Sequence, residues 1–297
     1  MRVLLTGGSG FTGGHVLREL RSHGHEVVGL ARSSDSADTL SAGGAEPIWG
    51  DLDDAASIDA AFADAAADCL INVASLGFGH APTIVSAAEN AGLARAVFVS
   101  TTAIFTALPA PSKRVRVAAE RTVTSSSLDW TIIRPTMIYG APDDRNLSRL
   151  VGLVSRTPVV PLPGDGSHLQ QPVHVADLAA TIVRAAERDV AIGHAYNVAG
   201  PEGITFRQIL EETYEAVGRS SRFVKIPMGA TRGVIGTYEQ IVPNPRLKVE
   251  QLDRLEEDKV FDISDARRDL DHDPRPFRDG IRSLVAALDA GNAAQTP

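Results

Sequence analysis

The sequence contains little of several residue types that mark particular classes of protein. Its single cysteine, Cys69, excludes an intramolecular disulfide. Because Cys69 lies in an apolar run, we expect a buried and unreactive thiol. No apolar stretch reaches the length of a membrane span. Basic residues are outnumbered by acidic ones, with a net charge of −8. This balance argues against binding to nucleic acid, whose phosphates attract Lys and Arg.

The chain also lacks a charged leader ahead of a long apolar segment, and it begins directly with a short apolar strand. We therefore expect a soluble, cytoplasmic protein with no membrane contact. The 297 residues, 43% of them hydrophobic, are enough for one large α/β domain or for a domain with a second lobe.

The first fourteen residues carry the most informative pattern. Gly7, Gly10 and Gly13 are spaced three residues apart. They follow an apolar run at 3–5 and lead into a segment with helical spacing at 11–20. Glycine permits a tight turn, close approach of a pyrophosphate and close packing of helix on sheet. The helix N-terminus then presents free N–H groups and its positive dipole end to phosphates. This pattern predicts a dinucleotide site that includes Gly7, Ser9, Gly10, Phe11, Thr12 and Gly13.

Strand and helix patterns alternate through the first half of the chain. This alternation predicts an α/β fold with a doubly wound parallel sheet, the Rossmann arrangement. Ligands of such folds bind at the C-terminal ends of the strands, which adds Leu52, Ala74, Ser75 and Ser100 to the predicted cofactor site. We expect strands at 2–6, 26–31, 46–49, 69–74, 95–101 and 130–135, and helices at 11–24, 54–67, 81–92 and 112–126.

After about residue 140 the pattern changes to clustered prolines and shorter elements. Helices are expected at 175–188, 205–217 and 276–289, with short apolar runs at 195–198 and 222–226, whereas the charged segment 243–257 is harder to place. We expect residues 1–140 to form the dinucleotide-binding domain, to which parts of later segments return. Residues 141–297 should form mostly a smaller mixed substrate-binding lobe.

The end of the second predicted strand bears on the choice of dinucleotide. An acidic residue here usually binds the ribose 2′-hydroxyl of NAD, but this chain has Ala31 followed by Arg32. A guanidinium can pair with a 2′-phosphate, which favours NADP over NAD. The alternative is that Arg32 is a solvated loop charge. Asp51, after the third strand, could accept a hydrogen bond from the adenine amino group, or it could cap the following helix.

Seven segments of the chain resemble the extended short-chain dehydrogenase/reductases, the NAD-dependent epimerase/dehydratase family. They occur in the family's order and cover nearly the whole chain. The resemblance implies a Rossmann domain for NAD(P) and a C-terminal lobe for a small-molecule substrate, often a nucleotide sugar. It also implies that Pro135 lies near the nicotinamide carboxamide. Members of the family often form homodimers, so the resemblance is compatible with a homodimer. The segments are TGGSGFTGGHV (6–16), GDL (50–52), FVSTT (98–102), LDWTIIRPTMIYG (128–140), GDGSHLQQPVHVADLA (164–179), YNVAGPEGITF (196–206) and FDISDARRDL (261–270).

The family's catalytic pair, a tyrosine and a lysine four residues later, is missing. In the family the tyrosine moves the alcohol proton while the lysine lowers its pKa and holds the nicotinamide ribose. Aligning the helix by Glu120 puts Ser112 and Arg116 at these positions, and aligning it by Lys113 puts Pro109 at the tyrosine position. The four tyrosines, Tyr139, Tyr196, Tyr214 and Tyr238, are followed four residues later by Asp143, Gly200, Gly218 and Val242.

Three residues are candidates for the catalytic roles. Thr101 occupies the family's Ser/Thr position, where a hydroxyl binds the reacting oxygen. Lys113 could move a proton if burial lowered its pKa, and His80 titrates near neutrality. For both, an ordinary solvated side chain is the alternative. Tyr139 and Arg145 are predicted to contact the substrate. The remaining histidines show no metal-ligand spacing, and we expect no metal: His15, His23, His25, His168, His174, His194 and His272.

Three functional hypotheses follow from this combination of features. The first is an atypical but active oxidoreductase or epimerase/dehydratase with a non-standard acid/base group, and this one is favoured. The second is a non-catalytic NAD(P)-binding sensor or accessory subunit, which the missing catalytic pair supports. The third is an RNA-associated relative, against which the acidic charge balance argues.

Overall fold

The computed structural model describes residues 1–297 apart from 109, 145, 158, 221, 244–248 and 295–297. The chain forms two compact units. Unit 1 consists of residues 1–136 and of two later segments that return to it, 175–198 and 262–273. Unit 2 consists of residues 137–174, 199–261 and 274–297.

Unit 1 is built on a seven-stranded sheet in which every pairing is parallel. The strand order is β11-β6-β5-β4-β1-β2-β3, so the chain winds outward in both directions from β1. This confirms the predicted doubly wound α/β fold. The strands are β1 (Arg2–Thr6), β2 (Glu26–Ala31), β3 (Glu46–Trp49), β4 (Cys69–Asn72), β5 (Arg95–Val99), β6 (Asp129–Pro135) and β11 (His194–Val198).

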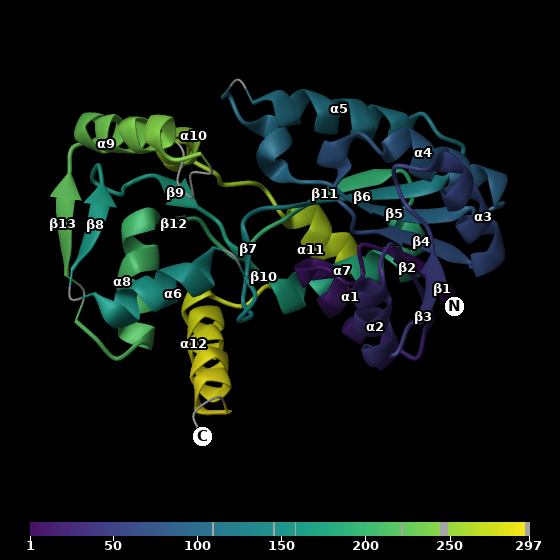
Figure 1. Ribbon diagram of the computed structural model, residues 1–297, viewed down its shortest axis with the longest axis horizontal. Coiled ribbons are helices and arrows are strands. Elements are labelled where there is room, and N and C mark those ends of the chain that lie inside the picture. Colours follow the sequence, from purple (N-terminus) through teal and green to yellow (C-terminus); the bar gives the residue numbers. More distant parts are fainter. Residues whose placement is uncertain (109, 145, 158, 221, 244–248, 295–297) are drawn as a thin grey trace. The chain divides into compact units, whose positions relative to one another are not determined.

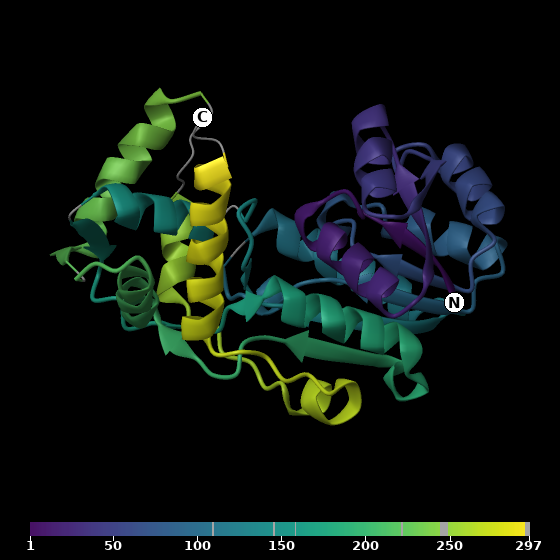
Figure 2. The same ribbon diagram turned by 90° about the horizontal axis from the view of Figure 1, so that it is seen from below.

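Helices cover both faces of this sheet (Figure 1). One layer contains α3, α4 and α5, and the other contains α1, α2 and α7. Figure 2 shows α11 lying along β11 and α7 at the sheet's edge. The helices are α1 (Phe11–Ser22), α2 (Ser34–Ala42), α3 (Ala55–Ala65), α4 (Ala81–Asn90), α5 (Pro111–Thr124), α7 (Val175–Glu187) and α11 (Ser264–Leu270).

Burial between the two helical layers explains the apolar character of the strands. Leu4, Leu70 and Phe98 are completely buried. Cys69 is buried as well, and burial raises the pKa of its thiol to about 12. A thiol with this pKa stays protonated near neutral pH, which agrees with the predicted unreactive cysteine.

Helix α2 is absent from the sequence-based prediction. Its sequence, SDSADTLSA, has little apolar periodicity and buries only Ala37 and Leu40. It begins instead with a capping box, in which Ser33 and Ser36 each satisfy the other's backbone N–H. Small polar residues thus start a helix at a place that a hydrophobic pattern does not mark.

Unit 2 combines two-stranded sheets with helices that pack on one another. Tyr139, Ile209 and Ile281 are fully buried in its main core. Its strands are β7 (Ile138–Tyr139), β8 (Val160–Pro163), β9 (Leu169–Gln170), β10 (Val173–His174), β12 (Ile204–Thr205) and β13 (Phe223–Ile226). Its helices are α6 (Leu147–Arg156), α8 (Phe206–Ala216), α9 (Met228–Ile241), α10 (Val249–Asp253) and α12 (Phe277–Ala294). Within the described part of the chain, every helix is too short or too polar to span a membrane.

Candidate functional site

The glycine turn between β1 and α1 has the geometry that the spacing predicts. Gly7 has a φ of +71°, and a Cβ there would lie 2.7 Å from the backbone nitrogen of Ala74. A Cβ on Gly13 would lie only 2.0 Å from the carbonyl oxygen of Gly7. Helix and turn therefore touch through bare backbone, and neither position has room for a side chain.

The start of α1 suits an anionic group. Gly10 is the N-cap residue and supplies no side-chain hydrogen bond to the first turn. The first N–H groups of a helix have no partner within the helix, and the dipole adds partial positive charge there. The N–H of Gly10 already donates to Gly7 O at 3.0 Å, so Phe11, Thr12 and Gly13 supply the free N–H groups of a backbone cradle that fits the predicted pyrophosphate.

A cavity of about 410 Å³ opens beside this turn, within unit 1. Its walls come from the C-terminal ends of β1, β2, β3 and β4, the edge at which doubly wound sheets bind ligands. Its volume lies within the usual range of small-molecule pockets, about 300–1,000 Å³. Seven of the predicted cofactor residues line it: Gly7, Ser9, Arg32, Asp51, Leu52, Ala74 and Ser75.

Arg32 lies at the end of β2, where it enters the wall of this cavity together with Ser33 and Ser36. Its backbone N–H donates to Ser36 Oγ at 3.2 Å, within the turn that begins α2. The N-terminus of α2 and the Arg32 guanidinium thus contribute positive charge to the same wall.

The structure decides between the two roles open to Asp51. The N-cap of α3 is Asp54, whose Oδ1 accepts hydrogen bonds from Ala56 N and Ser57 N. Asp51 instead lines the cavity, with its Oδ1 accepting from Asp53 N at 3.1 Å. The capping interpretation of Asp51 is therefore wrong, whereas a role toward a ligand stays a prediction.

His80 lies in the same cavity wall as Arg32, with its Nε2 2.9 Å from Asp53 Oδ1. Its Nδ1 is buried, and no described residue is within hydrogen-bond reach of it. Beside it, the ring of Phe78 lines the cavity with 78% of its surface exposed. Phe78 and Asp53 were not predicted as site residues, because a loop aromatic and the second of three closely spaced aspartates carry no motif.

The predicted residues after β5 have different environments. Ser100 Oγ donates to Glu120 Oε1 at 2.5 Å, so that hydroxyl is held by a buried carboxylate. Thr101 Oγ1 accepts from Ala103 N at 3.2 Å, which leaves its own proton able to donate to another group. Pro135, at the end of β6, accepts a hydrogen bond from Thr102 Oγ1 through its carbonyl at 3.2 Å.

Helix α5 carries the residues that stand near the family's missing catalytic pair. Arg116 Nη1 donates to Ser112 Oγ at 3.2 Å, one helical turn apart. Arg116 also lies against the loop after β4, where a Cβ on Gly77 would be 3.2 Å from its Nε. Lys113 Nζ donates to the carbonyl oxygen of Thr106 at 2.6 Å and is partly buried.

Of the two predicted substrate residues, the structure describes Tyr139, which belongs to unit 2. Tyr139 does not face a cleft, because it is fully buried with its ring edge-on to His174. Its hydroxyl is 3.5 Å from the carbonyl oxygen of Phe277. Tyr139 packs in the core of unit 2, so direct contact with a substrate is not supported. Arg145 lies outside the described residues.

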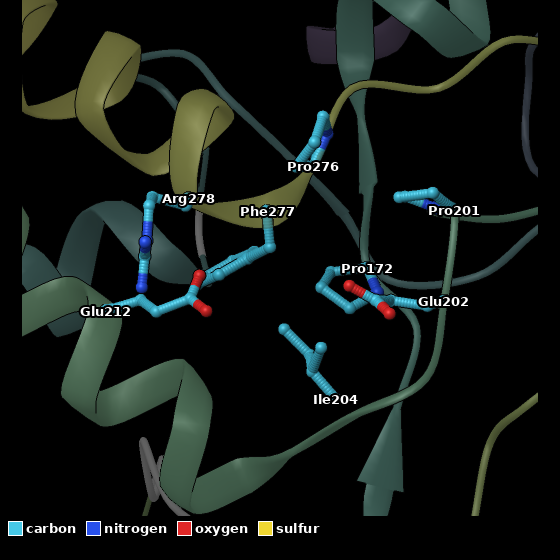
Figure 3. Close-up of a pocket in the computed structure, with 8 residues that line it drawn as sticks. All are labelled: Pro172, Pro201, Glu202, Ile204, Glu212, Pro276, Phe277 and Arg278. Atoms are coloured by element: carbon cyan, nitrogen blue, oxygen red, sulfur yellow. The ribbon is translucent and has the colours of Figure 1, made fainter.

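Unit 2 has a cavity of its own, of about 300 Å³ (Figure 3). Phe277, Ile204 and three prolines form apolar walls, and Glu202, Glu212 and Arg278 contribute charge. In Figure 3 the side chains of Glu212 and Arg278 lie side by side. Burial raises the pKa of Glu212 against the opposing effect of Arg278.

Comparison with known proteins identifies the family. Residues 7–189 match the family model described as NAD(P)H-binding. The chain is 28% identical to the mitochondrial NADH dehydrogenase [ubiquinone] 1 alpha subcomplex subunit 9 of Arabidopsis thaliana, covering 92% of this chain and 74% of that protein. It is also 28% identical to a 4-hydroxy-2-methyl-3-oxo-4-farnesyl-3,4-dihydroquinoline-1-oxide ketoreductase of Stigmatella aurantiaca, covering 99% and 98%.

Among solved structures, the fold is similar to that of a UDP-glucose-4-epimerase from Stenotrophomonas maltophila with bound NAD and formylated UDP-arabinopyranose. The TM-score is 0.76 at 19% identity, with 99% of both chains covered. This chain therefore shares the fold of that epimerase over nearly its whole length. Together with the match over residues 7–189, this shows that the chain belongs to the NAD(P)H-binding family.

Proposed function

We propose that this protein is an NADP(H)-dependent oxidoreductase, or an epimerase/dehydratase, that acts on a carbonyl or alcohol group of a polar small molecule such as a nucleotide sugar. The observation that carries the proposal is the cavity at the C-terminal strand edge, whose wall combines the bare glycine turn with Arg32. Both relatives named above align over most of their length, and one of them is a ketoreductase.

The adenosine end of the cofactor would occupy the cavity beside Arg32. The exposed ring of Phe78 offers a flat apolar surface for the adenine, and His80 lines the same cavity. We therefore assign His80 to cofactor binding in preference to proton transfer, since its Nε2 is already held by Asp53. Asp51 remains the candidate for the adenine amino group.

Replacing Arg32 by aspartate should reverse the preference between the two dinucleotides. A carboxylate repels the 2′-phosphate of NADPH and accepts a hydrogen bond from the 2′-hydroxyl of NADH. We expect the ratio of the NADH to the NADPH dissociation constant to fall by about 100-fold, measured by fluorescence titration. Arg149→Asp, which makes the same charge change at an exposed position of α6, should leave the ratio unchanged. If the ratio does not change in Arg32→Asp, the Arg32 guanidinium is a solvated charge that does not contact the cofactor.

Catalysis would use Thr101, just after β5, and residues of α5. Bound NADP(H) supplies or accepts the hydride. Thr101, whose hydroxyl proton can donate, would bind the reacting oxygen, and Lys113 would exchange the proton. Arg116 would stay charged and bind the nicotinamide ribose, because a guanidinium cannot exchange a proton near neutral pH.

The test is turnover of NADPH with a panel of nucleotide sugars and simple ketones. We expect Lys113→Met and Thr101→Val each to lower kcat by about 100-fold while the dissociation constant for NADPH stays the same. Lys225→Met, in β13 of unit 2, is the matched control. If Lys113→Met has wild-type turnover, the proton comes from another group.

A second candidate function is that of a non-catalytic, NADP(H)-binding accessory subunit. The absence of Tyr-x-x-x-Lys favours it, and one of the relatives is named as a subunit of NADH dehydrogenase. Tight NADPH binding with no hydride transfer to any member of the panel would support this function over the first.

A further inference from the structure

Three side chains that are far apart in the sequence meet where α1 and α7 end. His23 Nδ1 is 2.9 Å from Glu187 Oε1, and His25 Nε2 is 2.8 Å from the same oxygen. One nitrogen from each imidazole and one carboxylate oxygen lie within 4.8 Å of one another. We call these three residues the His-His-Glu cluster. The spacing of histidines along the chain could not reveal it, because Glu187 is 162 residues from His25.

The backbone holds the two histidines in place. Gly24, between them, has a φ of +77°. Gly24 N donates to Arg21 O and His25 N donates to Leu20 O, which ends α1 in a tight reverse turn. The His25 side chain is only 10% exposed, whereas His23 and Glu187 are 35% and 29% exposed. One imidazole is therefore fixed by packing, and the other two ligand groups remain open to solvent.

The electrostatics of the cluster suit a cation. His23 is the C-cap residue of α1, and Glu187 is the last residue of α7, so the negative dipole ends of two helices meet here. Burial tends to raise the pKa of Glu187, but hydrogen bonds from His23 and His25 outweigh it and lower the pKa. Glu187 thus carries its negative charge near neutral pH.

Other charged groups surround the cluster. Glu19 Oε1 lies 3.4 Å from His23 Nε2, the nitrogen that faces away from Glu187. Such a carboxylate is the usual outer partner that orients a metal-bound imidazole. The amino group of Met1 lies 3.4 Å from His25 Nδ1, and Arg21 binds the carbonyl oxygen of His25.

We propose that the His-His-Glu cluster is a binding site for Zn²⁺ or a similar borderline divalent ion. Zinc binds imidazole nitrogen and carboxylate oxygen at about 2.0–2.2 Å, so that ligands of a tetrahedral site lie about 3.3 Å apart. The two nitrogen–oxygen separations, at 2.9 and 2.8 Å, are already shorter than this, and all three ligand atoms lie within 4.8 Å of one another. Two imidazoles favour zinc over Ca²⁺ or Mg²⁺, which prefer oxygen ligands.

The bound ion would join the ends of α1 and α7 across unit 1 and leave a fourth position for water. Since α1 has 12 residues, the site lies about 18 Å from the glycine turn. Zinc binding can therefore be measured separately from cofactor binding.

The test is a calorimetric titration of the full-length, tag-free protein with ZnCl₂, with Co²⁺ absorption as a second readout. We expect one ion per chain, and a rise in Tm of about 5 °C at zinc concentrations a hundredfold above Kd. Glu187→Gln, His23→Ala and His25→Ala should each weaken binding by at least about 100-fold. Glu19→Gln should weaken it by about 10-fold.

His168→Ala is the matched control, since His168 pairs with Asp258 at 3.2 Å as a single histidine–carboxylate pair. It should keep wild-type zinc affinity, and all variants should keep wild-type affinity for NADPH. If His25→Ala fails to fold, the zinc affinities of the His23 and Glu187 variants test the proposal, because these two side chains are more exposed. Absence of saturable binding below about 1 mM, or binding that survives in Glu187→Gln and His23→Ala, would overturn the proposal.

Discussion

Gly13→Ala is expected to abolish cofactor binding. The new Cβ would be placed 2.0 Å from the carbonyl oxygen of Gly7, a backbone atom that cannot rotate away. Helix α1 would have to move off the turn, at a cost of about 1–3 kcal/mol, and its first N–H groups would leave the pyrophosphate. We expect the dissociation constant for NADPH to rise by more than about 100-fold in fluorescence titration.

Gly14→Ala is the matched control for this experiment. It makes the same substitution one residue later in the same helix, where the nearest atom to a new Cβ is 3.9 Å away. Alanine has the higher helix propensity, so this variant should gain about 0.5–1 kcal/mol of stability and keep its cofactor affinity. Equal affinities of the two variants would show that the close contact at Gly13 does not control binding.

Glu120→Gln is expected to lower the free energy of unfolding by about 3 kcal/mol, since it breaks a largely buried ion pair. The Glu120 carboxylate accepts from Arg134 Nη2 at 2.6 Å, from Arg134 Nε at 3.1 Å and from Ser100 Oγ at 2.5 Å. The side chains of Glu120 and Arg134 are 8% and 20% exposed. The amide of glutamine keeps the shape but leaves the guanidinium without a counter-charge. Urea unfolding followed by circular dichroism measures the change.

Asp265→Asn provides the comparison within unit 1. Asp265 pairs with Arg268 at 2.7 Å, but both side chains are about two-thirds exposed, at 67% and 64%. Solvent screening limits such pairs to about 1 kcal/mol or less. Similar losses in Glu120→Gln and Asp265→Asn would mean that burial adds little to the contribution of the Glu120–Arg134 pair.

Much of unit 1 could be predicted from local patterns. The six expected strands correspond to β1–β6, and the helix after the glycine turn is α1. A parallel strand that is buried on both faces needs an uninterrupted apolar run, and such runs are visible in the sequence. Helices α2 and α11 were missed because they are short and polar, and their starts depend on capping and on neighbours.

The candidate site was predictable where a backbone requirement fixes the residue type. Gly7 and Gly13 have no room for a side chain, and the seven predicted residues around the cavity come from strand ends that a parallel sheet brings together. Side-chain pairings between distant segments could not be predicted. The contacts of His80 with Asp53, and of His25 with Glu187, depend on which loops the sheet order makes neighbours.

The sequence by itself determined the dinucleotide turn, the α/β class and the absence of a Tyr-x-x-x-Lys pair, because each depends on residues close together along the chain. Only the tertiary structure decided that Asp54 rather than Asp51 caps α3, that Tyr139 is buried in unit 2, and that two histidines meet a glutamate at the ends of α1 and α7. Burial and long-range contact are properties of packed elements, and packing joins residues whose separation along the chain carries no local signal.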